Sequence, residues 1–387
     1  MIFGEPRLTE GDQQVLGLID QQRSRLKLFT QQSPRRWLGS LRRSTFARAI
    51  QGSNSIEGYN ATIDEAIAAV ENEPPLDERT ETWLAIKGYR DALTYIMQAA
   101  QDPYFEFSKQ FLKSLHFMMI GHELTKYPGQ WRPGVVFVAR QETGETVYEA
   151  PDVEMVDALV QELVDYLKAA SNSHSIVRAA MAHLNLTMIH PFKDGNGRMA
   201  RALQTMVLAR DGILHPVFSS IEEWLGRNTV AYYAILAEVG KGKWNPRADA
   251  LPWVQFCLRA HFQQAAVLIR RNEEYGALFD GVERIIAREV MPDRMALPLF
   301  DAALGRRLTN ARYQTDAEAT QHVAARDLRK LSDLGLLVPI GEKRGRSYVA
   351  GPELKQLRDK VRIVRPLEDP YVALKGKASD QQRDLPL

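Results

Sequence analysis

Two apolar helical stripes that stop and restart around a short polar loop constrain the fold of this chain more than any other feature. Their members are Val177, Met181, Leu184 and Met188 before the loop, then Met199, Leu203, Met206 and Val207 after it. Because the residue before a proline disfavours the α region, the first helix must end near His190. The sequence therefore predicts two helices within Ile176–Leu208, joined by a tight loop.

Helical spacing of apolar residues also dominates the N-terminal third and the stretch Trp253–Val290. Thr62-Ile63-Asp64-Glu65 offers a capping hydroxyl with a glutamate three residues later. A helix should begin there, and the preceding short helix should end near Gly58. Val135–Val138 and Val147-Tyr148 flank a polar stretch with Gly144 at its turn, which predicts a β-hairpin.

The chain from Met291 onward resembles a separate unit. Ala324, Leu328 and Leu331 give one helix an apolar edge, Gly335 is placed to end it, and Leu336–Val349 reads as two short strands. This order predicts a winged helix-turn-helix. The expected domains are an N-terminal helical region over 1–100, a catalytic core over 101–265, connecting helices over 266–290, the winged domain over 291–370, and a polar, disordered tail over 371–387.

Composition limits the classes of function. The chain has 387 residues, of which 25% are charged. It has neither an apolar run long enough for a membrane span nor the basic-then-apolar order of a signal peptide, so no membrane partner and a cytoplasmic location are expected. Its single cysteine, Cys257, lies in an apolar run and is expected in the core. A net charge of +2 means that any DNA contact must be local.

The loop between the two central helices carries residues suited to a triphosphate. Gly195 and Gly197 let the backbone approach an anion closely, and the new helix directs its unpaired amides to the same place. Arg198 and Arg201 lie three apart on one helix face, so both guanidinium groups can bind phosphate oxygens. Asn196 can donate to the same anion.

Two further residues of the loop suit proton transfer and metal binding. Asp194 offers the hard oxygen ligand that Mg²⁺ prefers, with the remaining ligands supplied by phosphates and water. His190, at the end of the preceding helix, can take the proton of an attacking hydroxyl. Taken singly, each residue is also explained by turn chemistry, a helix end or a surface ion pair. Their convergence within twelve residues favours a catalytic site, and Phe192 is interpreted as an apolar plug.

At this point the sequence resembles the Fic family, whose signature His-Pro-Phe-x-Asp/Glu-Gly-Asn-Gly-Arg-x-x-Arg is matched at every fixed position by His190–Arg201. The resemblance extends from about Trp37 to Arg259. It includes the hairpin Gly129–Pro151, similar to the family's flap, and Tyr232-Tyr233, similar to its aromatic pair. It implies a mainly α-helical Fic body with a β-hairpin flap, here followed by a winged helix-turn-helix.

The resemblance also implies roles for the loop residues. His190 is the general base, Asp194 the Mg²⁺ ligand, and Arg201 the partner of the γ-phosphate. The other phosphate ligands are Gly195, Asn196, Gly197 and Arg198. An intact Gly-Asn-Gly-Arg loop is similar to that of members that transfer AMP from ATP to a protein hydroxyl. Lys193 occupies the variable position and receives no role.

A second match lies far upstream, where Ser53–Gly58 resembles the family's inhibitory motif, Ser/Thr-x-x-x-Glu-Gly/Asn. Ser53, Glu57 and Gly58 occupy its fixed positions. A carboxylate from Glu57 would satisfy Arg201 and make that arginine unavailable to a γ-phosphate. The alternative is a solvated glutamate at a helix end.

Three weaker signals leave alternatives open. The flap edge is interpreted as the docking site of an unknown target protein, although Tyr148 suits simple cross-strand packing. Tyr232 and Tyr233 suit either core packing or an adenine contact. The C-terminal unit carries a basic set that could meet DNA phosphates, although Asp327 and Asp333 dilute it; its members are Arg326, Arg329, Lys330, Lys343, Arg344 and Arg346.

The sequence thus predicts a protein adenylyltransferase that uses ATP and Mg²⁺ and is inhibited by Glu57. Two other functions stay open. One is an enzyme that uses Glu57 to activate water and remove AMP from a modified protein. The other is a DNA-binding regulator whose Fic body only senses nucleotide or forms a homodimer.

Overall fold

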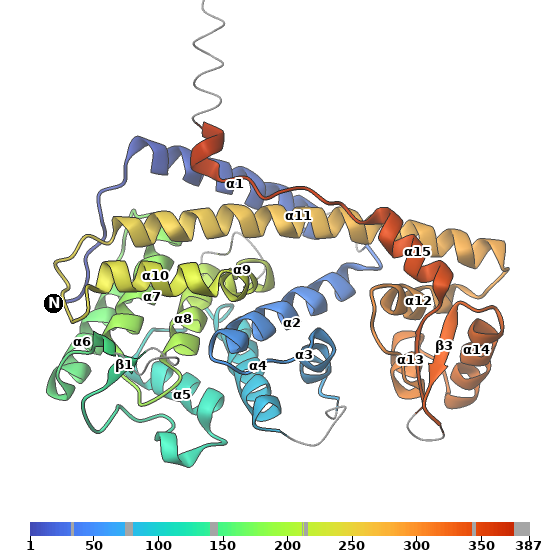
Figure 1. Ribbon diagram of the computed structural model, residues 1–387, viewed down its shortest axis with the longest axis horizontal. Helices are drawn as coiled ribbons and strands as arrows, with labels where there is room; N and C mark the ends of the chain where they lie inside the picture. Colours follow the sequence, from blue (N-terminus) through green and yellow to red (C-terminus); the bar gives the residue numbers. More distant parts are fainter. Residues whose placement is uncertain are drawn as a thin grey trace, which may run out of the picture. The chain divides into compact units, whose positions relative to one another are not determined.

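The computed structural model describes residues 1–31, 35–73, 80–139, 146–210, 212, 216–342 and 346–374 (Figure 1). The chain divides into two compact units. Unit 1 comprises Met1–Lys27, Ser44–Ala266 and Leu367–Leu387, and unit 2 comprises Leu28–Arg43 and Val267–Pro366. Helices dominate both units, which confirms the predicted mainly α-helical class.

Unit 1 contains the predicted catalytic loop. Its helices are α1 (Glu10–Gln31), α2 (Leu38–Ile56), α3 (Ile63–Val70), α4 (Glu81–Ala99), α5 (Lys109–Ile120), α6 (Val153–Lys168), α7 (Ser175–Ile189), α8 (Asn196–Arg210), α9 (Glu222–Arg227), α10 (Thr229–Gly240) and the first part of α11 (Leu251–Arg288), with short 3-10 turns η1 (Leu124–Lys126) and η2 (Pro216–Phe218). α1, α2 and α11 each contribute residues to both units.

The helices α7 and α8 pack against each other at the centre of this unit (Figure 1). α7 is buried on two sides, because Leu186 and Ile189 face one hydrophobic cluster while Met181 and Leu184 face another. On α8, Met199, Leu203 and Met206 join the first cluster. Burial on both sides holds the loop between the two helices at a fixed place, and this confirms the two helices expected around His190.

Local sequence signals set the helix ends near the inhibitory motif. α2 ends at Ile56, and Gly58 follows with a φ of 85°, a backbone conformation that suits glycine. Thr62 caps α3: its side chain accepts from the N–H of Glu65, whose carboxylate accepts from the N–H of Thr62. The capping box predicted for this helix start is confirmed.

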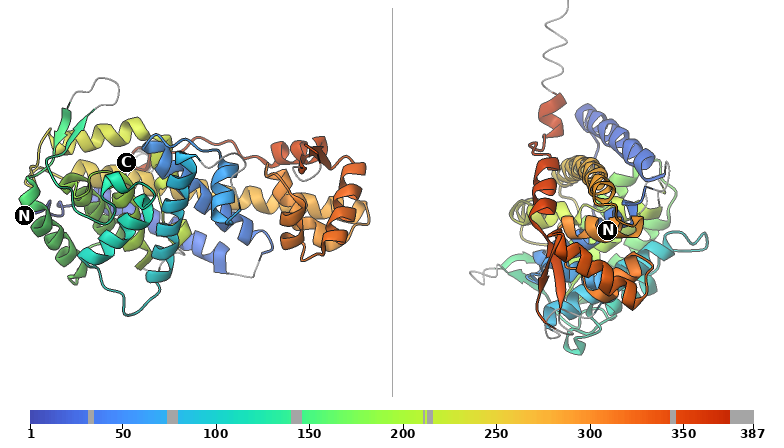
Figure 2. Two further views of the ribbon diagram at one scale, coloured as in Figure 1. Left: turned by 90° about the horizontal axis from the view of Figure 1, so that it is seen from below. Right: turned by 90° about the vertical axis from the view of Figure 1, so that its right-hand side faces the viewer.

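The predicted hairpin consists of β1 (Phe137–Ala139) and β2 (Thr146–Glu149), which pair antiparallel (Figure 2). Its second strand also contacts the segment after α10, since the N–H of Glu149 donates to the carbonyl of Gly242. The polar stretch Gln141–Glu145, with the turn expected at Gly144, lies outside the described residues. The described contacts of the flap are thus those of its two strands near the base of the hairpin.

The stretch from Trp253 to Val290 differs from the expected group of helices. It is almost entirely one helix, α11, of 38 residues. Proline occurs only near its start, at Pro252, so nothing within it forces a break. The two interior glycines allow close packing of neighbouring side chains. An added Cβ atom would approach Trp37 at Gly276 and Leu357 at Gly281.

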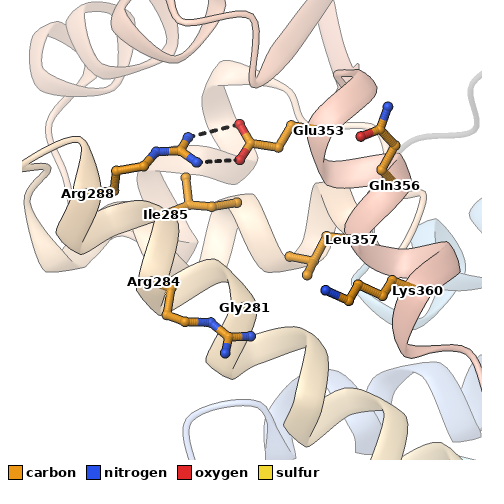
Figure 3. A pocket seen from close by; sticks show the side chains of 8 residues that line it. All are labelled: Gly281, Arg284, Ile285, Arg288, Glu353, Gln356, Leu357 and Lys360. Carbon is orange, nitrogen blue, oxygen red and sulfur yellow. Dashed lines mark hydrogen bonds and ion pairs between the residues drawn. The ribbon is translucent and has the colours of Figure 1, made fainter.

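In unit 2 the helix predicted around Leu328 and the two predicted short strands are present, and the winged helix-turn-helix stays a prediction. The further elements of unit 2 are η3 (Asp293–Met295), α12 (Ala296–Ala303), α13 (Asn310–Asp316), α14 (Gln321–Asp333), β3 (Leu337–Ile340), β4 (Ser347–Ala350) and α15 (Pro352–Val361). β3 and β4 pair antiparallel, and a bridge between Leu308 and Tyr348 extends the pair. α15 lies along α11, where Arg288 and Glu353 form a bidentate ion pair (Figure 3).

Two predictions from composition can be compared with the structure. Cys257 is buried with a free thiol, as expected, and burial raises the pKa of that thiol. Within the described ranges, each helix is too short or too polar to cross a membrane. The expected tail lies, from residue 375 onward, outside those ranges.

Candidate active site

His190 ends the central helix α7 in an unusual backbone conformation. It is the C-cap residue, with φ 51° and ψ 56°, the left-handed region that few side chains adopt. Its N–H still donates to the carbonyl of Leu186. Pro191 follows and cannot continue the helix. The chain therefore turns sharply at the predicted base.

The ring of His190 is in the form that a base requires. Its Nδ1 lies 3.2 Å from the carbonyl oxygen of Thr187, which can only accept, so Nδ1 carries the hydrogen and Nε2 keeps a free lone pair. Burial lowers the pKa of the imidazole to about 4; the Thr187 carbonyl opposes this shift and Arg132 adds to it. The ring is consequently neutral at pH 7.

Phe192 and Asn196 close the loop. Phe192 is fully buried, as expected of an apolar plug. The side-chain amide of Asn196 donates to the carbonyl of Phe192 at 2.8 Å and its oxygen accepts from the Phe192 N–H at 2.9 Å. Both polar atoms of that side chain are therefore engaged within the loop. Any phosphate contact of Asn196 falls to its backbone N–H, at the start of α8, rather than to its side chain.

The two arginines of α8 are buried without a full set of acceptors. Arg198 and Arg201 are each 1% exposed. Within the described ranges, Nε and Nη1 of Arg198 and Nη1 of Arg201 meet no hydrogen-bond acceptor. Buried donors left in this state are costly, so the arrangement is suited to an anion that is brought in as a ligand.

The structure brings Glu57 to Arg201, although they lie 144 residues apart in the chain. Nη2 of Arg201 donates to Oε1 of Glu57 at 2.6 Å, and Ser53 accepts from the same guanidinium through its hydroxyl at 2.7 Å and its carbonyl at 3.0 Å. Gly197 permits this approach, because a Cβ there would collide with the carboxylate of Glu57. Tyr59, two residues on, places its ring 5.1 Å from the guanidinium carbon of Arg198.

Electrostatics favour an ion pair here. Burial alone would lower the pKa of Arg201, but Glu57, Tyr232 and Tyr89 outweigh burial, and the pKa of this guanidinium is raised. Arg201 is therefore a permanent buried cation. Such a buried cation requires a facing anion.

Asp194 stands at the open side of the loop as an ionised carboxylate. Burial favours its neutral form, but Arg198, the N–H of Gly195 and Lys126 lower its pKa. Nζ of Lys126 lies 3.4 Å from Oδ2. The described residues hold no group of three His, Cys, Asp or Glu side chains that could form a metal site by themselves. A Mg²⁺ ion at Asp194 would thus need oxygens from phosphate and water, which is its usual preference.

The aromatic pair divides between two environments. Tyr232 is buried, and its hydroxyl lies 2.9 Å from Nε2 of His183. Tyr233 is 47% exposed, and its hydroxyl donates to the carbonyl of Ile56 at 3.2 Å. Core packing accounts for Tyr232 and not for Tyr233. An adenine contact of either residue stays a prediction.

Sequence reasoning missed His116, a buried histidine of α5 that supports the loop. Its Nδ1 accepts from the N–H of Gly129 at 2.9 Å, so Nε2 carries the hydrogen and donates to the carbonyl of Asp194 at 3.0 Å. The ring stacks on Phe192 with centroids 3.8 Å apart. Burial lowers its pKa to about 4, so it is neutral. A lone histidine in an apolar stripe gave no signal of this role.

A buried carboxyl behind Arg201 was also missed. Glu222 accepts from the hydroxyl of Tyr89 at 2.6 Å and from that of Thr205 at 3.1 Å. Burial raises its pKa, against the influence of Tyr89 and Arg201. It contributes a second acidic group to the surroundings of Arg201. In the sequence, Glu222-Glu223 is indistinguishable from two glutamates at the protein surface.

Comparison with known proteins points to one family. The model of the Fic/DOC family matches residues 106–208. A protein adenylyltransferase Fic of Nematostella vectensis is 28% identical over 261 residues, covering 66% of this chain and 55% of that protein. Protein adenylyltransferase fic-1 of Caenorhabditis elegans is 31% identical over 143 residues, covering 36% and 26%. The chain thus spans about half, or less, of these curated relatives.

Solved structures share the fold. A Fic family protein from Desulfovibrio desulfuricans G20 aligns with a TM-score of 0.58 at 22% identity, covering 90% of this chain and 99% of that one. Fic-1 of C. elegans, residues 134–508, aligns with a TM-score of 0.54 at 22% identity, covering 67% and 72%. At this identity the likeness concerns the fold alone.

Proposed function

We propose that the protein is an adenylyltransferase that moves AMP from ATP to a hydroxyl side chain of another protein, on the premise that residues 106–208, which match the model of the Fic/DOC family, form such a domain. The observation that carries the proposal is the pair of buried arginines, Arg198 and Arg201, whose free donors lie beside the glycine loop. A triphosphate supplies the oxygens that these donors lack. The adenylyltransferase names of the relatives support the same reaction.

The proposed chemistry needs one proton transfer and one displacement. The acceptor hydroxyl gives its proton to Nε2 of His190, and its oxygen forms a bond to the α-phosphorus of ATP. The bond from that phosphorus to the oxygen bridging the β-phosphate breaks. Pyrophosphate leaves with the electron pair. Arg198, Arg201 and the first amides of α8 hold the phosphates in place.

Mg²⁺ fits this site at Asp194, whose carboxylate is ionised and faces the loop. When bound, the ion would neutralise phosphate charge and help to orient the triphosphate. Asp194→Asn keeps an acceptor for the N–H of Gly195, which now donates to Oδ1, and removes only the negative charge. We expect the Mg²⁺ concentration for half-maximal transfer to rise about tenfold or more. An unchanged Mg²⁺ dependence would remove Asp194 from the metal site.

The identity of the acceptor is open to direct measurement. Lysate treated with ATP and a Glu57→Gly variant should yield peptides with AMP on Ser, Thr or Tyr. The double variant Glu57→Gly/His190→Asn is the matched control and should yield none. Equal yields from the two variants would mean that this site does not catalyse the transfer.

The proposal also covers the docking of the target protein, the location and the assembly state. The target protein is proposed to dock at the flap edge as an added strand. A cytoplasmic location and a homodimer are proposed as well. Cell fractionation and light scattering test these two proposals.

A second candidate function is DNA binding by unit 2. The observation that favours it is the burial of the Asp327 side chain. That carboxylate is turned inward, contrary to the expectation from sequence, although its Oδ1 still lies 3.7 Å from Nε of the exposed Arg326. It is 2% exposed and accepts from Arg294 at 2.7 and 3.0 Å and from Tyr313 at 3.1 Å. Asp333 remains exposed.

The solvent side of α14 is correspondingly basic. Ala324, Leu328 and Leu331 are fully buried, whereas Arg326, Arg329 and Lys330 are exposed. On the hairpin Arg346 is exposed, and Lys343 and Arg344 lie outside the described residues. Unit 2 as a whole carries 23 Lys and Arg against 14 Asp and Glu, an excess that the net charge of the chain conceals. α14 is the second helix of the pair α13 and α14, and in helix-turn-helix proteins it is the second helix that enters the major groove.

The salt dependence of binding tests this candidate. The protein of 387 residues should bind duplex DNA, and replacing Arg326, Arg329 and Lys330 by Gln should reduce the slope of log affinity against log salt by about 3, since each phosphate contact contributes about 0.9. Gln at Lys87, Lys243 and Arg247, three exposed cations of unit 1, is the matched control and should leave the slope unchanged. Absent binding, or equal slopes for both triple variants, would reject DNA as the partner of α14.

A further inference from the structure

Arg132 is a buried arginine that donates to three backbone carbonyls, one of them two residues away and the others 19 and 58 residues away. It lies between η1 and β1 and is 2% exposed. Its Nε donates to the carbonyl of His190 at 2.9 Å, its Nη1 to that of Gly134 at 2.6 Å, and its Nη2 to that of Pro151. Among the ion pairs of the described residues, none includes this guanidinium. Its partners are therefore peptide dipoles.

Two of its contacts fix the turn that contains the predicted base. The side chain binds the carbonyl of His190, and the backbone N–H of Arg132 donates to the carbonyl of Pro191 at 2.9 Å. His190 is held in the left-handed region, which is unfavourable for most side chains. A cation at the C-terminus of a helix also meets its unpaired carbonyls and the negative end of its dipole. Arg132 thereby caps α7 at its last residue.

The other two contacts fix the base of the flap. Gly134 precedes β1 and Pro151 follows β2, so one guanidinium joins both ends of the hairpin. Tyr148 of β2 forms a second connection between the hairpin and α7. Its buried hydroxyl donates to the carbonyl of Met188, in the last turn of α7, at 2.8 Å. The hairpin base and the end of the catalytic helix are consequently one bonded assembly.

We infer that Arg132 is a positioning residue that sets the placement of the flap base relative to His190, and therefore aligns a docked acceptor hydroxyl with the base. The inference rests on the proposed AMP transfer. Within the described residues, the hydrogen bonds of Arg132 reach neither Gly195 nor α8, where the proposed phosphate ligands lie. Loss of its geometry should therefore reduce transfer to protein and leave ATP affinity nearly unchanged.

The planar guanidinium is what allows three carbonyls to be reached in three directions. A lysine ammonium keeps the charge but is a point donor on a flexible stem. Arg132→Lys therefore separates geometry from charge. Arg178 provides a matched control within the same unit, because its Nη2 also donates to three backbone carbonyls, those of Tyr166, Leu167 and Ala169, at 3.0 to 3.1 Å.

The experiment compares Arg132→Lys and Arg178→Lys in a Glu57→Gly background. For Arg132→Lys we expect kcat for protein labelling to fall about tenfold or more, with the Kd of ATP changed less than about twofold. Arg178→Lys should leave both values near those of the parent, even if its thermal stability falls. A parallel loss of ATP affinity in Arg132→Lys, or equal kcat values for the two variants, would overturn the positioning role.

Hydrogen exchange tests the bonded assembly without reference to activity. In Arg132→Lys, amides of residues 147–150 and 188–192 should exchange faster together, while those of α8 keep their protection. Unchanged exchange at both segments would overturn the inference even where transfer is impaired. A different result would reject only the proposed reaction. If both segments exchange faster, but neither Arg132→Lys nor its Glu57→Gly parent labels any protein, the bonded assembly is supported and AMP transfer is rejected.

Discussion

Replacing His190 by asparagine is expected to lower the rate of AMP transfer by about a hundredfold or more, because the acceptor hydroxyl loses its proton acceptor. Asparagine is the appropriate substitute, since it tolerates the left-handed backbone that His190 adopts, whereas alanine is strained there. ATP affinity should persist, because the phosphate ligands lie on the loop and α8. Initial rates of protein labelling, with calorimetric ATP binding alongside, measure both quantities.

His322→Ala, at an exposed histidine of unit 2, is the control and should transfer AMP at the parental rate. A pure His190→Asn protein that still labels at a near-parental rate would remove His190 from the role of base. Loss of both transfer and ATP binding, with the melting temperature retained, would instead place His190 among the nucleotide ligands.

Removing the carboxylate of Glu57 is expected to accelerate transfer. In the structure Oε1 of Glu57 lies 2.6 Å from Nη2 of Arg201, the group that we propose as the partner of the γ-phosphate. A charge-assisted hydrogen bond of this kind contributes roughly 1.5–3 kcal/mol, so Glu57→Gly should raise self-labelling and target labelling by about tenfold or more. Glu57→Gln should give a smaller gain, because it keeps the shape and loses the charge.

Two controls isolate the contact. Glu238→Gln removes an exposed glutamate of α10 and should change nothing. Arg201→Ala added to Glu57→Gly should cancel the gain, since we propose that the released arginine binds the nucleotide. A gain that survives without Arg201 would show that Glu57 acts elsewhere.

The same variant separates inhibition from AMP removal. If Glu57 activates water, Glu57→Gly accumulates modified protein only because removal has stopped, and the initial rate of labelling does not rise. Single-turnover labelling with excess enzyme distinguishes the two cases. Faster incorporation supports inhibition, and an unchanged or slower initial rate rejects it.

The central loop could be predicted from sequence because its signals are local. Proline at 191 ends one helix, glycines at 195 and 197 open the next, and Arg198 and Arg201 follow at the spacing of one helix face. The capping box at Thr62 and the stop at Gly335, with its φ of 69°, are local in the same sense. Such features depend on neighbours within a few residues, and the fold preserves them.

Other features depend on contacts that no local pattern encodes. Asn196 was expected to donate to phosphate, yet its side chain closes the loop on Phe192. Asp327 was expected at the surface, yet Arg294 draws it inward. His116 and Arg132 act through carbonyls of residues far along the chain. For Asn196, His116 and Arg132 the partners are backbone groups, which every residue possesses and which leave no trace in the sequence, whereas Asp327 pairs with the side chain of Arg294, 33 residues away.

The transfer of AMP itself is tested most directly by following the label from ATP that is radioactive in either its α-phosphate or its γ-phosphate. Purified Glu57→Gly protein should become labelled from α-labelled ATP, release pyrophosphate in step with the labelling, and lose both signals when His190→Asn is added. Labelling of protein from γ-labelled ATP would contradict the account, because it would mean phosphate transfer, and so would pyrophosphate release that leaves every protein unlabelled.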